Sequence, residues 1–487
     1  MSKQNNIIGN LLWKFAERIS AQLVTLVVSV VLARMLEPTD YGVISVVTIF
    51  ITLANVLVSD GFGSALIQKK DADALDFCSV LYANVAMMIL LYGVLFALAP
   101  FIGSFFGEGY EMLPAVLRVL GLRIIVAGVN SVQQAYVSRK MIFRKFFWAT
   151  LIGTIVSAVV GIGMALAGCG VWALVAQYLT NTIVGTIVLA VSLKKRPRLI
   201  FSFARLKGLM RYGSKVLGTS LLITGYQELR ALIIGKVYSS ADLAYYDKGK
   251  QFSSLIVTNI NTSISAVLFP KMSQEQDDLT RVKETTRMAI RFSSYIMSPL
   301  MLGLAAAAEP FVRLVLTEKW LPCVNLLRLF CIVFLFQPMH SANAQAIKAI
   351  GRSDIYLKLE IIKKALELVV LLAVMWISVD AIVVGMAAMT VLFTAVNALP
   401  NQKLLNYNYK EQISDILPAI AMAAVMAVVV YFIGMLRMNT LLLLVIQILA
   451  GACIYLFLSV VTGNQQFQYL CGVIKSMLHK KKKGVSQ

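Results

Sequence analysis

The sequence predicts an all-α polytopic membrane protein with about fourteen transmembrane helices. Its composition, its apolar segments and the placement of its basic residues all predict this fold class. Hydrophobic residues make up 59% of the 487 residues and charged residues 14%, with a mean hydropathy of +0.78. Because a soluble domain carries roughly 25% charged residues, this much apolar surface requires lipid as its solvent.

Each predicted span is an apolar segment of at least about 20 residues, the length that crosses the hydrocarbon core as a helix. Glycine, proline or short polar turns separate the spans, and no connection is long enough for a soluble catalytic domain. The first segment lacks a small-residue cleavage site and exceeds a signal-peptide core, so we expect it to be retained. The spans are predicted at 11–36, 41–67, 77–103, 112–137, 144–168, 171–193, 211–237, 244–270, 288–308, 323–348, 356–378, 381–402, 413–435 and 439–462.

Loop charge predicts the orientation of the chain. The net charge is +21, from 45 Lys and Arg against 24 Asp and Glu. Such an excess also occurs in nucleic-acid-binding proteins, but here the basic residues gather between apolar segments, as at 139–145, 194–215 and 480–483. Opposite turns such as 37–40 and 108–111 are acidic. The positive-inside rule therefore predicts an even number of spans with both termini in the cytoplasm.

An internal repeat divides the predicted helices into groups. A shift of 202 residues places Arg34 on Lys236 and Asp40 on Asp242, and a shift of 213 residues places Phe143 on Tyr356. Both copies begin on the cytoplasmic side, which predicts two parallel six-helix repeats. We expect an N-terminal lobe at 1–200, a C-terminal lobe at 201–408, and helices thirteen and fourteen with a basic tail at 409–487. The alternative is chance similarity between apolar segments.

Polar and charged residues inside the spans are the candidate functional groups. A charge at a helix centre costs roughly 2.5–3.5 kcal/mol on insertion scales, so it should face water, an anion or a counter-charge. Polar stripes on spans one, two, four, seven and eight, including Asn130 and Gln134 on span four, predict a central hydrated cavity. Its excess of positive charge favours an anionic cargo, with Arg suited to bidentate phosphate contacts.

The cavity residues expected to bind this anionic cargo are Arg34, Arg118, Arg123, Arg230, Lys236, Lys250, Gln22, Asn55, Gln227 and Asn261. The candidates for ion coupling are Asp60, Glu228 and Asp247. Helix packing, structural ion pairs and snorkelling are the alternative roles, and snorkelling applies most to Arg34 and Lys236 near their helix ends.

The last two spans differ from the others because they are mostly apolar and lack a polar stripe. They form either a lipid-facing groove for a long hydrocarbon tail or a peripheral support for folding. The sequence contains no Walker motif, no His-Glu-x-x-His, no nucleophile elbow and no Cys-x-x-Cys pair among its six cysteines. We therefore expect neither catalytic residues nor a metal site, and no cofactor other than a coupled proton or sodium ion.

Three segments resemble the Wzx-type polysaccharide flippases of the multidrug/oligosaccharidyl-lipid/polysaccharide exporter superfamily, nearest its colanic-acid-exporter-like branch. The segments are Leu32–Leu36 with Glu37–Gly42, Asp60–Gln68, and Gln345–Arg352. The resemblance implies two lobes in a V shape, alternating access, and a location in the bacterial cytoplasmic membrane. It implies an undecaprenyl-pyrophosphate-linked oligosaccharide as cargo, moved to the outer leaflet for O-antigen, capsule or exopolysaccharide synthesis. Partners would be this cargo, membrane lipids and other polysaccharide assembly proteins, without nucleic acid.

Two other functions stay open from the sequence. A cation-coupled multidrug antiporter of the same superfamily would favour an acidic cavity, and a deep acidic residue in span one is absent here. A membrane polysaccharide polymerase or ligase would resemble proteins with a large outer loop, whereas the longest outer connection here is about fifteen residues, at 308–322.

Overall fold

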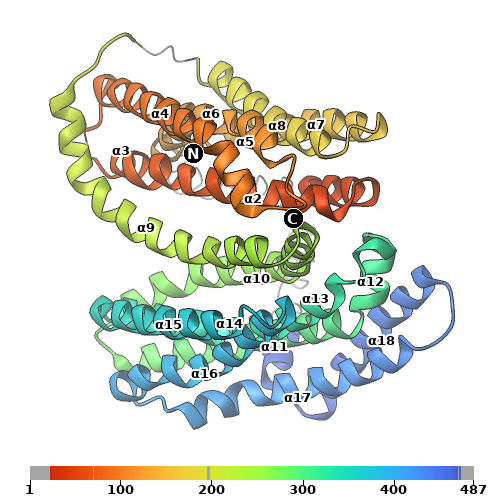
Figure 1. Cartoon of the computed structure of the whole chain (residues 1–487). Helices are drawn as coiled ribbons and strands as arrows, with labels where there is room; N and C mark the ends of the chain where they lie inside the picture. Colours follow the sequence, from red (N-terminus) through yellow and green to blue (C-terminus); the bar gives the residue numbers. More distant parts are fainter. Residues whose placement is uncertain (1–21, 70, 195–197, 470, 473–487) are drawn as a thin grey trace, which may run out of the picture. The chain divides into compact units, whose positions relative to one another are not determined.

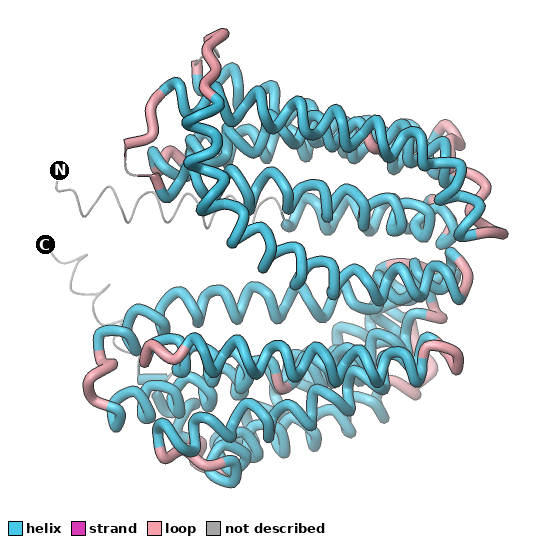
Figure 2. The backbone as a smooth tube through the Cα atoms, turned by 60° about the vertical axis from the view of Figure 1, so that its left-hand side comes forward, coloured by secondary structure: helices cyan, strands magenta, loops and turns pink. Residues whose placement is uncertain are grey.

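The computed structural model describes residues 22–69, 71–194, 198–469 and 471–472. The described backbone consists of helices joined by short loops and contains no strand, as Figure 2 shows. This confirms the all-α fold class. The chain forms two compact units, one extending to Ala244 and the other starting at Tyr245. The lobe boundaries at residues 200 and 408 stay predictions, because they follow the sequence repeat and not this division.

The N-terminal unit begins with a helix at Gln22–Met35. The elements that follow are α2 (Pro38–Val56), η1 (Leu57–Gly63), α3 (Ser64–Gln68), α4 (Ala74–Phe106), α5 (Leu113–Leu120), α6 (Leu122–Lys140), α7 (Phe143–Leu166), α8 (Val171–Leu193) and α9 (Phe203–Val237), of which Figure 1 labels the α-helices.

Helix α10 (Ser240–Gln274) begins in the first unit and continues into the second. The C-terminal unit then contains α11 (Leu279–Ala306), α12 (Ala308–Val315), η2 (Glu318–Trp320), α13 (Cys323–Leu335), α14 (Gln337–Ala349), α15 (Ser353–Val374), α16 (Val379–Leu405), α17 (Tyr409–Ile433) and α18 (Thr440–Val461).

Every predicted span coincides with a described helix or with consecutive helical segments, the first from Gln22 onward. Ten of the described helices are long and apolar enough to cross a membrane. Helices α9 and α10 are long enough, at 35 residues each, but carry many polar side chains. The same holds for α15, which carries Glu360, Lys363, Lys364 and Glu367. The number of fourteen crossings therefore stays a prediction.

Three of the spans are interrupted at positions that the hydropathy pattern does not reveal. Between α2 and α3, η1 is a π-helix of seven residues. Gly121 separates α5 from α6, and Phe336 separates α13 from α14, whose second residue is Pro338. A π segment leaves one residue out of the regular helical hydrogen-bond pattern and is frequent at functional sites.

The helix starts support the internal repeat. At the start of α2 the N–H of Glu37 donates to Asp40 Oδ2 over 3.2 Å, and at the start of α10 the N–H of Ser239 donates to Asp242 Oδ2 over 3.1 Å. The two caps are 202 residues apart, which is the shift that the sequence predicts.

The second predicted shift, of 213 residues, needs a correction. Before α7 the N–H of Ile142 donates to the carbonyl of Val137, and before α15 the N–H of Arg352 donates to the carbonyl of Ile347. These equivalent turns lie 210 residues apart in the chain. The shift of 213 is therefore one turn too long, because similar residues recur at every turn of an apolar helix.

Glycines allow close helix contacts in the N-terminal unit. A Cβ added to Gly213 of α9 would lie 2.4 Å from the carbonyl oxygen of Gly61 in η1, and one added to Gly161 of α7 would lie 2.7 Å from Cβ of Gln177 in α8. Gly42 of α2 packs in the same way against the backbone of Ser240 at the start of α10. Small residues at helix contacts are the usual packing device of membrane proteins, and here they bring α9 close to η1, α7 close to α8, and α2 close to α10.

Helices α17 and α18, which the sequence predicts to lack a polar stripe, make polar contacts with α11 of the C-terminal unit. Asp415 of α17 is buried and accepts hydrogen bonds from Arg287 Nε over 2.7 Å and Arg291 Nε over 2.8 Å, both from α11. Tyr295 of α11 donates to Ser459 of α18 over 2.8 Å. These pairs lie far apart in the sequence, so hydropathy alone does not reveal them.

Candidate functional site

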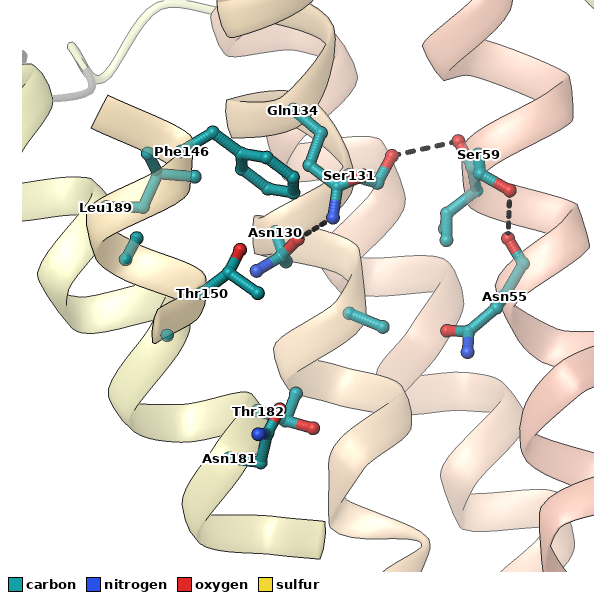
Figure 3. Close-up of a pocket in the computed structure, with 14 residues that line it drawn as sticks. Asn55, Ser59, Asn130, Ser131, Gln134, Phe146, Thr150, Asn181, Thr182 and Leu189 are labelled. Atoms are coloured by element: carbon teal, nitrogen blue, oxygen red, sulfur yellow. Dashed lines mark hydrogen bonds between the residues drawn. The ribbon is translucent and has the colours of Figure 1, made fainter. Parts of the chain in front are cut away.

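A polar cavity of about 400 Å³ lies within the N-terminal unit, among α2, η1, α6, α7 and α8 (Figure 3). Eight of its lining side chains are amides or hydroxyls: Asn55, Ser59, Asn130, Ser131, Gln134, Thr150, Asn181 and Thr182. The other described lining residues are apolar or glycine, and none of them carries a carboxylate or a basic group. Since hydrocarbon offers no hydrogen bonds, such a cluster at the depth of these helices is suited to water or a polar ligand.

The α6 wall of the cavity is held in place by its own hydrogen bonds. Asn130 Nδ2 donates to Thr186 Oγ1 of α8 over 2.8 Å, and Gln134 Nε2 donates to Asn130 Oδ1 one turn away. Ser131 donates to the carbonyl of Val58 in η1 over 3.0 Å. This last bond ties α6 to the π segment, where the shifted helical pattern points a carbonyl toward a neighbouring helix.

Across the cavity, Asn55 and Ser59 lie on the α2–η1 segment and face α6, as Figure 3 shows. Ser59 donates its hydroxyl to the carbonyl of Asn55 over 2.7 Å. The side-chain amide of Asn55 is half-buried and has no hydrogen-bond partner within the described residues. It therefore has both donors and its acceptor available to a ligand, and its role in binding cargo stays a prediction.

Arg123 places a positive charge beside the cavity. Its Nε donates to the hydroxyl of Thr182, a lining residue, over 2.9 Å, and its guanidinium lies 5.2 Å from the centre of the Tyr178 ring. Arg123 is half-buried, and no carboxylate pairs with it in the part of the chain that the structure describes. A guanidinium held by a hydroxyl and an aromatic ring keeps further donors for an anion.

Asp60 lies on the π segment, directly after the lining residue Ser59. Its side chain is half-buried and does not line the cavity. The neighbouring Gly61 is the residue against which α9 packs through Gly213. The π segment thus connects a carboxylate, a cavity wall and a helix contact, and the ion-coupling role of Asp60 stays a prediction.

The other predicted residues of the N-terminal unit do not line this cavity. Arg118 contacts α4 instead, with its guanidinium 4.6 Å from the Phe96 ring. Lys236 donates to the carbonyl of Phe105 at the end of α4, near the end of its own helix. Arg230 donates to Tyr226 one turn away over 3.3 Å. Residues also placed outside the cavity lining are Gln22 and Arg34 on the first helix and Gln227 and Glu228 on α9.

The predicted residues of α10 belong to the C-terminal unit. Asp247, Lys250 and Asn261 are all half-buried on this helix. Between the first two, Lys248 is buried and donates to Gln251 Oε1 over 3.2 Å, with its ammonium 5.7 Å from the Trp320 ring. Their role in cargo binding or coupling stays a prediction.

Sequence reasoning missed several polar groups of the site. Thr150, Asn181 and Thr182 line the cavity from α7 and α8, but isolated Thr and Asn residues are common in helix packing and give no distinct signal. Sequence reasoning also missed the ion cluster of Asp415 with Arg287 and Arg291 in the C-terminal unit. Charged residues inside or beside predicted spans, as these are, could have identified the cluster.

Comparisons with known proteins relate the chain to proteins of polysaccharide biosynthesis. A family profile described as "Polysaccharide biosynthesis protein" matches residues 31–325. The chain is 25% identical over 290 residues to the succinoglycan biosynthesis transport protein ExoT of Rhizobium meliloti (strain 1021), a match covering 60% of this chain and 58% of ExoT. It is 25% identical over 371 residues to the lipopolysaccharide biosynthesis protein WzxC of Escherichia coli (strain K12), covering 74% of each chain.

Among solved structures, the chain is similar to the lipid II flippase MurJ in an inward closed conformation. The TM-score is 0.74 at 15% sequence identity, and the match covers 93% of this chain and 98% of the other. At this identity the likeness concerns the fold.

Proposed function

Because the chain belongs to the polysaccharide biosynthesis protein family, we propose that it is a flippase that moves lipid-linked oligosaccharide units across the cytoplasmic membrane. The resemblance to Wzx-type flippases that the sequence predicts is confirmed by this family membership and by the similarity to WzxC. The cargo class proposed is an undecaprenyl-pyrophosphate-linked repeat unit for surface polysaccharide. The sugar composition follows from the host's own polysaccharide.

The observation that carries the proposal is the chemistry of the cavity among α2, η1, α6, α7 and α8. Its amides and hydroxyls match the donors and acceptors of sugar hydroxyls, and Arg123 beside it matches a phosphate. A cationic drug would favour carboxylates in the lining, and the lining residues that the structure describes include none. The cavity therefore supports a polar or anionic cargo over the cationic cargo of a multidrug antiporter.

The proposed mechanism is alternating access with rocking lobes, driven by a proton or sodium gradient. Asp60 is the coupling candidate that the structure favours most, since it lies on the π segment that also forms a cavity wall through Val58 and Ser59. A change in its protonation or ion binding would act directly on this wall. Both termini are proposed to lie in the cytoplasm.

Gene deletion followed by identification of the accumulating lipid-linked saccharide tests the proposal. We expect undecaprenyl-pyrophosphate-linked repeat units to accumulate with their sugars facing the cytoplasm, and surface polysaccharide to fall. Re-expression of the wild-type chain should reverse both effects. Normal surface polysaccharide without accumulation in the deletion strain would contradict the proposal, and dye export restored by the chain would favour the drug antiporter.

A further inference from the structure

A second cavity of the N-terminal unit, of about 770 Å³, lies among α4, α6 and α8 and is separate from the polar cavity described above. The two cavities share no lining residue. The lining of the second cavity is Ala72, Asp73, Ala74, Phe77, Cys78, Leu81, Val129, Val132, Gln133, Tyr136, Arg139, Lys140, Ala190, Leu193 and Arg198.

The lining changes from basic to apolar along the helix axes. On α6 the residues that line the cavity recur in helical steps on one face, and they are Val129, Val132, Gln133, Tyr136, Arg139 and Lys140. Lys140 is the last residue of α6, and Val129 lies eleven residues deeper. At a rise of 1.5 Å per residue this distance is about 16 Å, close to half of the roughly 30 Å hydrocarbon core. The graded wall thus has the depth of one leaflet.

The other walls repeat this gradient. On α4 the cavity begins at Asp73 and continues through Phe77 to Leu81, and α8 contributes Ala190 and Leu193. Arg198 follows α8 and is fixed near α4, because its carbonyl accepts a hydrogen bond from the Tyr82 hydroxyl over 3.0 Å. All the polar ends therefore lie at the same end of the helices, which the loop-charge pattern predicts to be cytoplasmic.

Two cations at the polar end form no ion pair with the described part of the chain. Lys140 and Arg198 are exposed, and neither pairs with a carboxylate within the described residues. Arg139 differs, since it donates to the carbonyls of Leu66 and Lys69 at the end of α3. Among the described residues that line the cavity, one carboxylate, that of Asp73, also lies at this end.

Asp73 does not cancel the charge of the two cations. The N–H of Asp76 donates to its carboxylate over 2.9 Å, and Arg205 lies 3.7 Å away, and these contacts hold the pKa of Asp73 below its usual range. Arg205 therefore offsets this charge. The net excess at the mouth is positive, and Gln133 adds a buried Oε1 that accepts no hydrogen bond in the structure.

We propose that this cavity binds an anionic phospholipid of the leaflet, with its phosphate between Lys140 and Arg198 and an acyl chain along Phe77, Leu81 and Val129. The side chains of Ile187, Val191 and Leu199 near the α8 wall are 55%, 70% and 94% exposed, so that the rim of the cavity presents apolar surface to lipid. A bilayer lipid is favoured over the proposed cargo because the graded wall has the depth of one leaflet, which matches an acyl chain and is much shorter than an extended undecaprenyl chain.

The test uses the purified full-length protein in nanodiscs that contain equal amounts of phosphatidylglycerol and phosphatidylcholine, followed by native mass spectrometry of the lipids that stay bound. We expect the wild type to retain phosphatidylglycerol preferentially. The double variant Lys140→Ala/Arg198→Ala should lower this preference by about thirtyfold, since each basic residue near an anionic lipid contributes about fivefold. The matched control is Lys403→Ala/Lys410→Ala, which removes two exposed cations of the C-terminal unit and should retain the wild-type preference.

A second variant tests the cavity without altering its charge. Ala190 is exposed on the α8 wall, so Ala190→Trp should fill the groove, keep the fold and displace the lipid. Monodisperse elution in size-exclusion chromatography confirms folding of each variant. Wild-type retention of phosphatidylglycerol by both folded variants would overturn the proposal. So would displacement of the lipid by equimolar undecaprenyl pyrophosphate, because the cavity would then be a cargo site.

Discussion

At the scale of single residues, Arg123 differs from the other cations predicted to bind cargo. Arg123 contacts Thr182, which lines the polar cavity, and within the described residues Arg123 pairs with no carboxylate. Arg118 and Lys236 instead contact aromatic rings and backbone carbonyls of α4. Charge inside a predicted span identified all three as candidates. The packing of the helices shows which of the three lies beside the polar cavity, because it determines which neighbouring helix each side chain faces.

We predict that Arg123→Ala lowers cargo transport strongly without unfolding the protein. Thr182 keeps its hydrogen bond to the carbonyl of Tyr178, which is 3.1 Å long, so that little structure is lost. A lost charge-assisted hydrogen bond to the cargo is worth about 1.5–3 kcal/mol, or roughly tenfold to hundredfold in affinity. Transport of fluorescent lipid-linked saccharide into liposomes measures the effect.

Two further variants make this prediction specific. Arg123→Lys keeps the charge but loses the bidentate geometry, so we expect it to restore transport in part. Arg281→Ala removes an exposed cation that pairs with Asp278 at the start of α11, and it should transport like the wild type. Transport by Arg123→Ala at the wild-type rate would remove Arg123 from the cargo site.

At the scale of elements, hydropathy predicted where helices lie but not how they are interrupted. Helix α18 at Thr440–Val461 differs by one residue at each end from the predicted span 439–462. Helix α11 begins at Leu279, nine residues before its predicted span, because a helix continues into polar surroundings beyond the hydrocarbon. The π segment and the break at Gly121 depend on local packing and leave no signature in hydropathy.

The contact between α9 and the π segment predicts that alanine lowers the stability of the protein at one glycine of α9 and raises it at another. A Cβ at Gly213 would meet the carbonyl oxygen of Gly61 at 2.4 Å, and a backbone atom has little room to yield. Gly213→Ala should therefore destabilise the protein by about 1–3 kcal/mol. Gly218→Ala on the same helix meets nothing within 4 Å and should stabilise it by about 0.5–1 kcal/mol. Thermal unfolding of both variants in detergent decides the matter, and equal shifts would contradict the close contact.

The contact between α11 and α17 gives a second prediction at this scale. Asp415 is 1% exposed and is the shared partner of Arg287, Arg291 and the hydroxyl of Tyr407. Asp415→Asn keeps the shape of the side chain but removes the charge that two arginines face. Since an unmatched charge in a buried ion cluster is costly, we expect a loss of about 3 kcal/mol, read from thermal unfolding.

The matched control is Asp354→Asn, which breaks an exposed pair with Arg352 at the start of α15 and should leave the unfolding temperature nearly unchanged. In addition, Asp415→Asn combined with Arg291→Met should recover part of the lost stability, because one unmatched charge is then removed. An unfolding temperature for Asp415→Asn equal to that of the control would show that the cluster does not hold α17 in place.

At the scale of the whole molecule, the sequence predicted the repeat more securely than the number of crossings. Equivalent caps 202 residues apart at α2 and α10 support the repeat, since capping depends on local sequence. The number of crossings is predicted from the hydropathy of each helix, and α9 and α10 are too polar to be recognised as membrane spans in this way. Their 35 residues give a length of about 52 Å, ample for a 30 Å core. Their polar faces are expected of spans that border a hydrated cavity, so their polarity is no argument against crossing.

The side of the membrane on which each connection lies shows whether α9, α10 and α15 cross it. Single cysteines introduced into a cysteine-free variant at Glu108, Ser239 and Arg437 should react with a membrane-impermeant maleimide added outside cells, because all three are predicted to lie beyond the outer face. Cysteines at Asp277 and Lys403 should react only after the membrane is opened. If α9 and α10 do not cross, Ser239 stays unreactive while the others keep their pattern. If α15 alone does not cross, Lys403 becomes reactive from outside and Arg437 does not. Labelling of all five cysteines as predicted therefore requires that α9, α10 and α15 all span the membrane. A different labelling result is expected if α9 and α10 do not cross than if α15 does not.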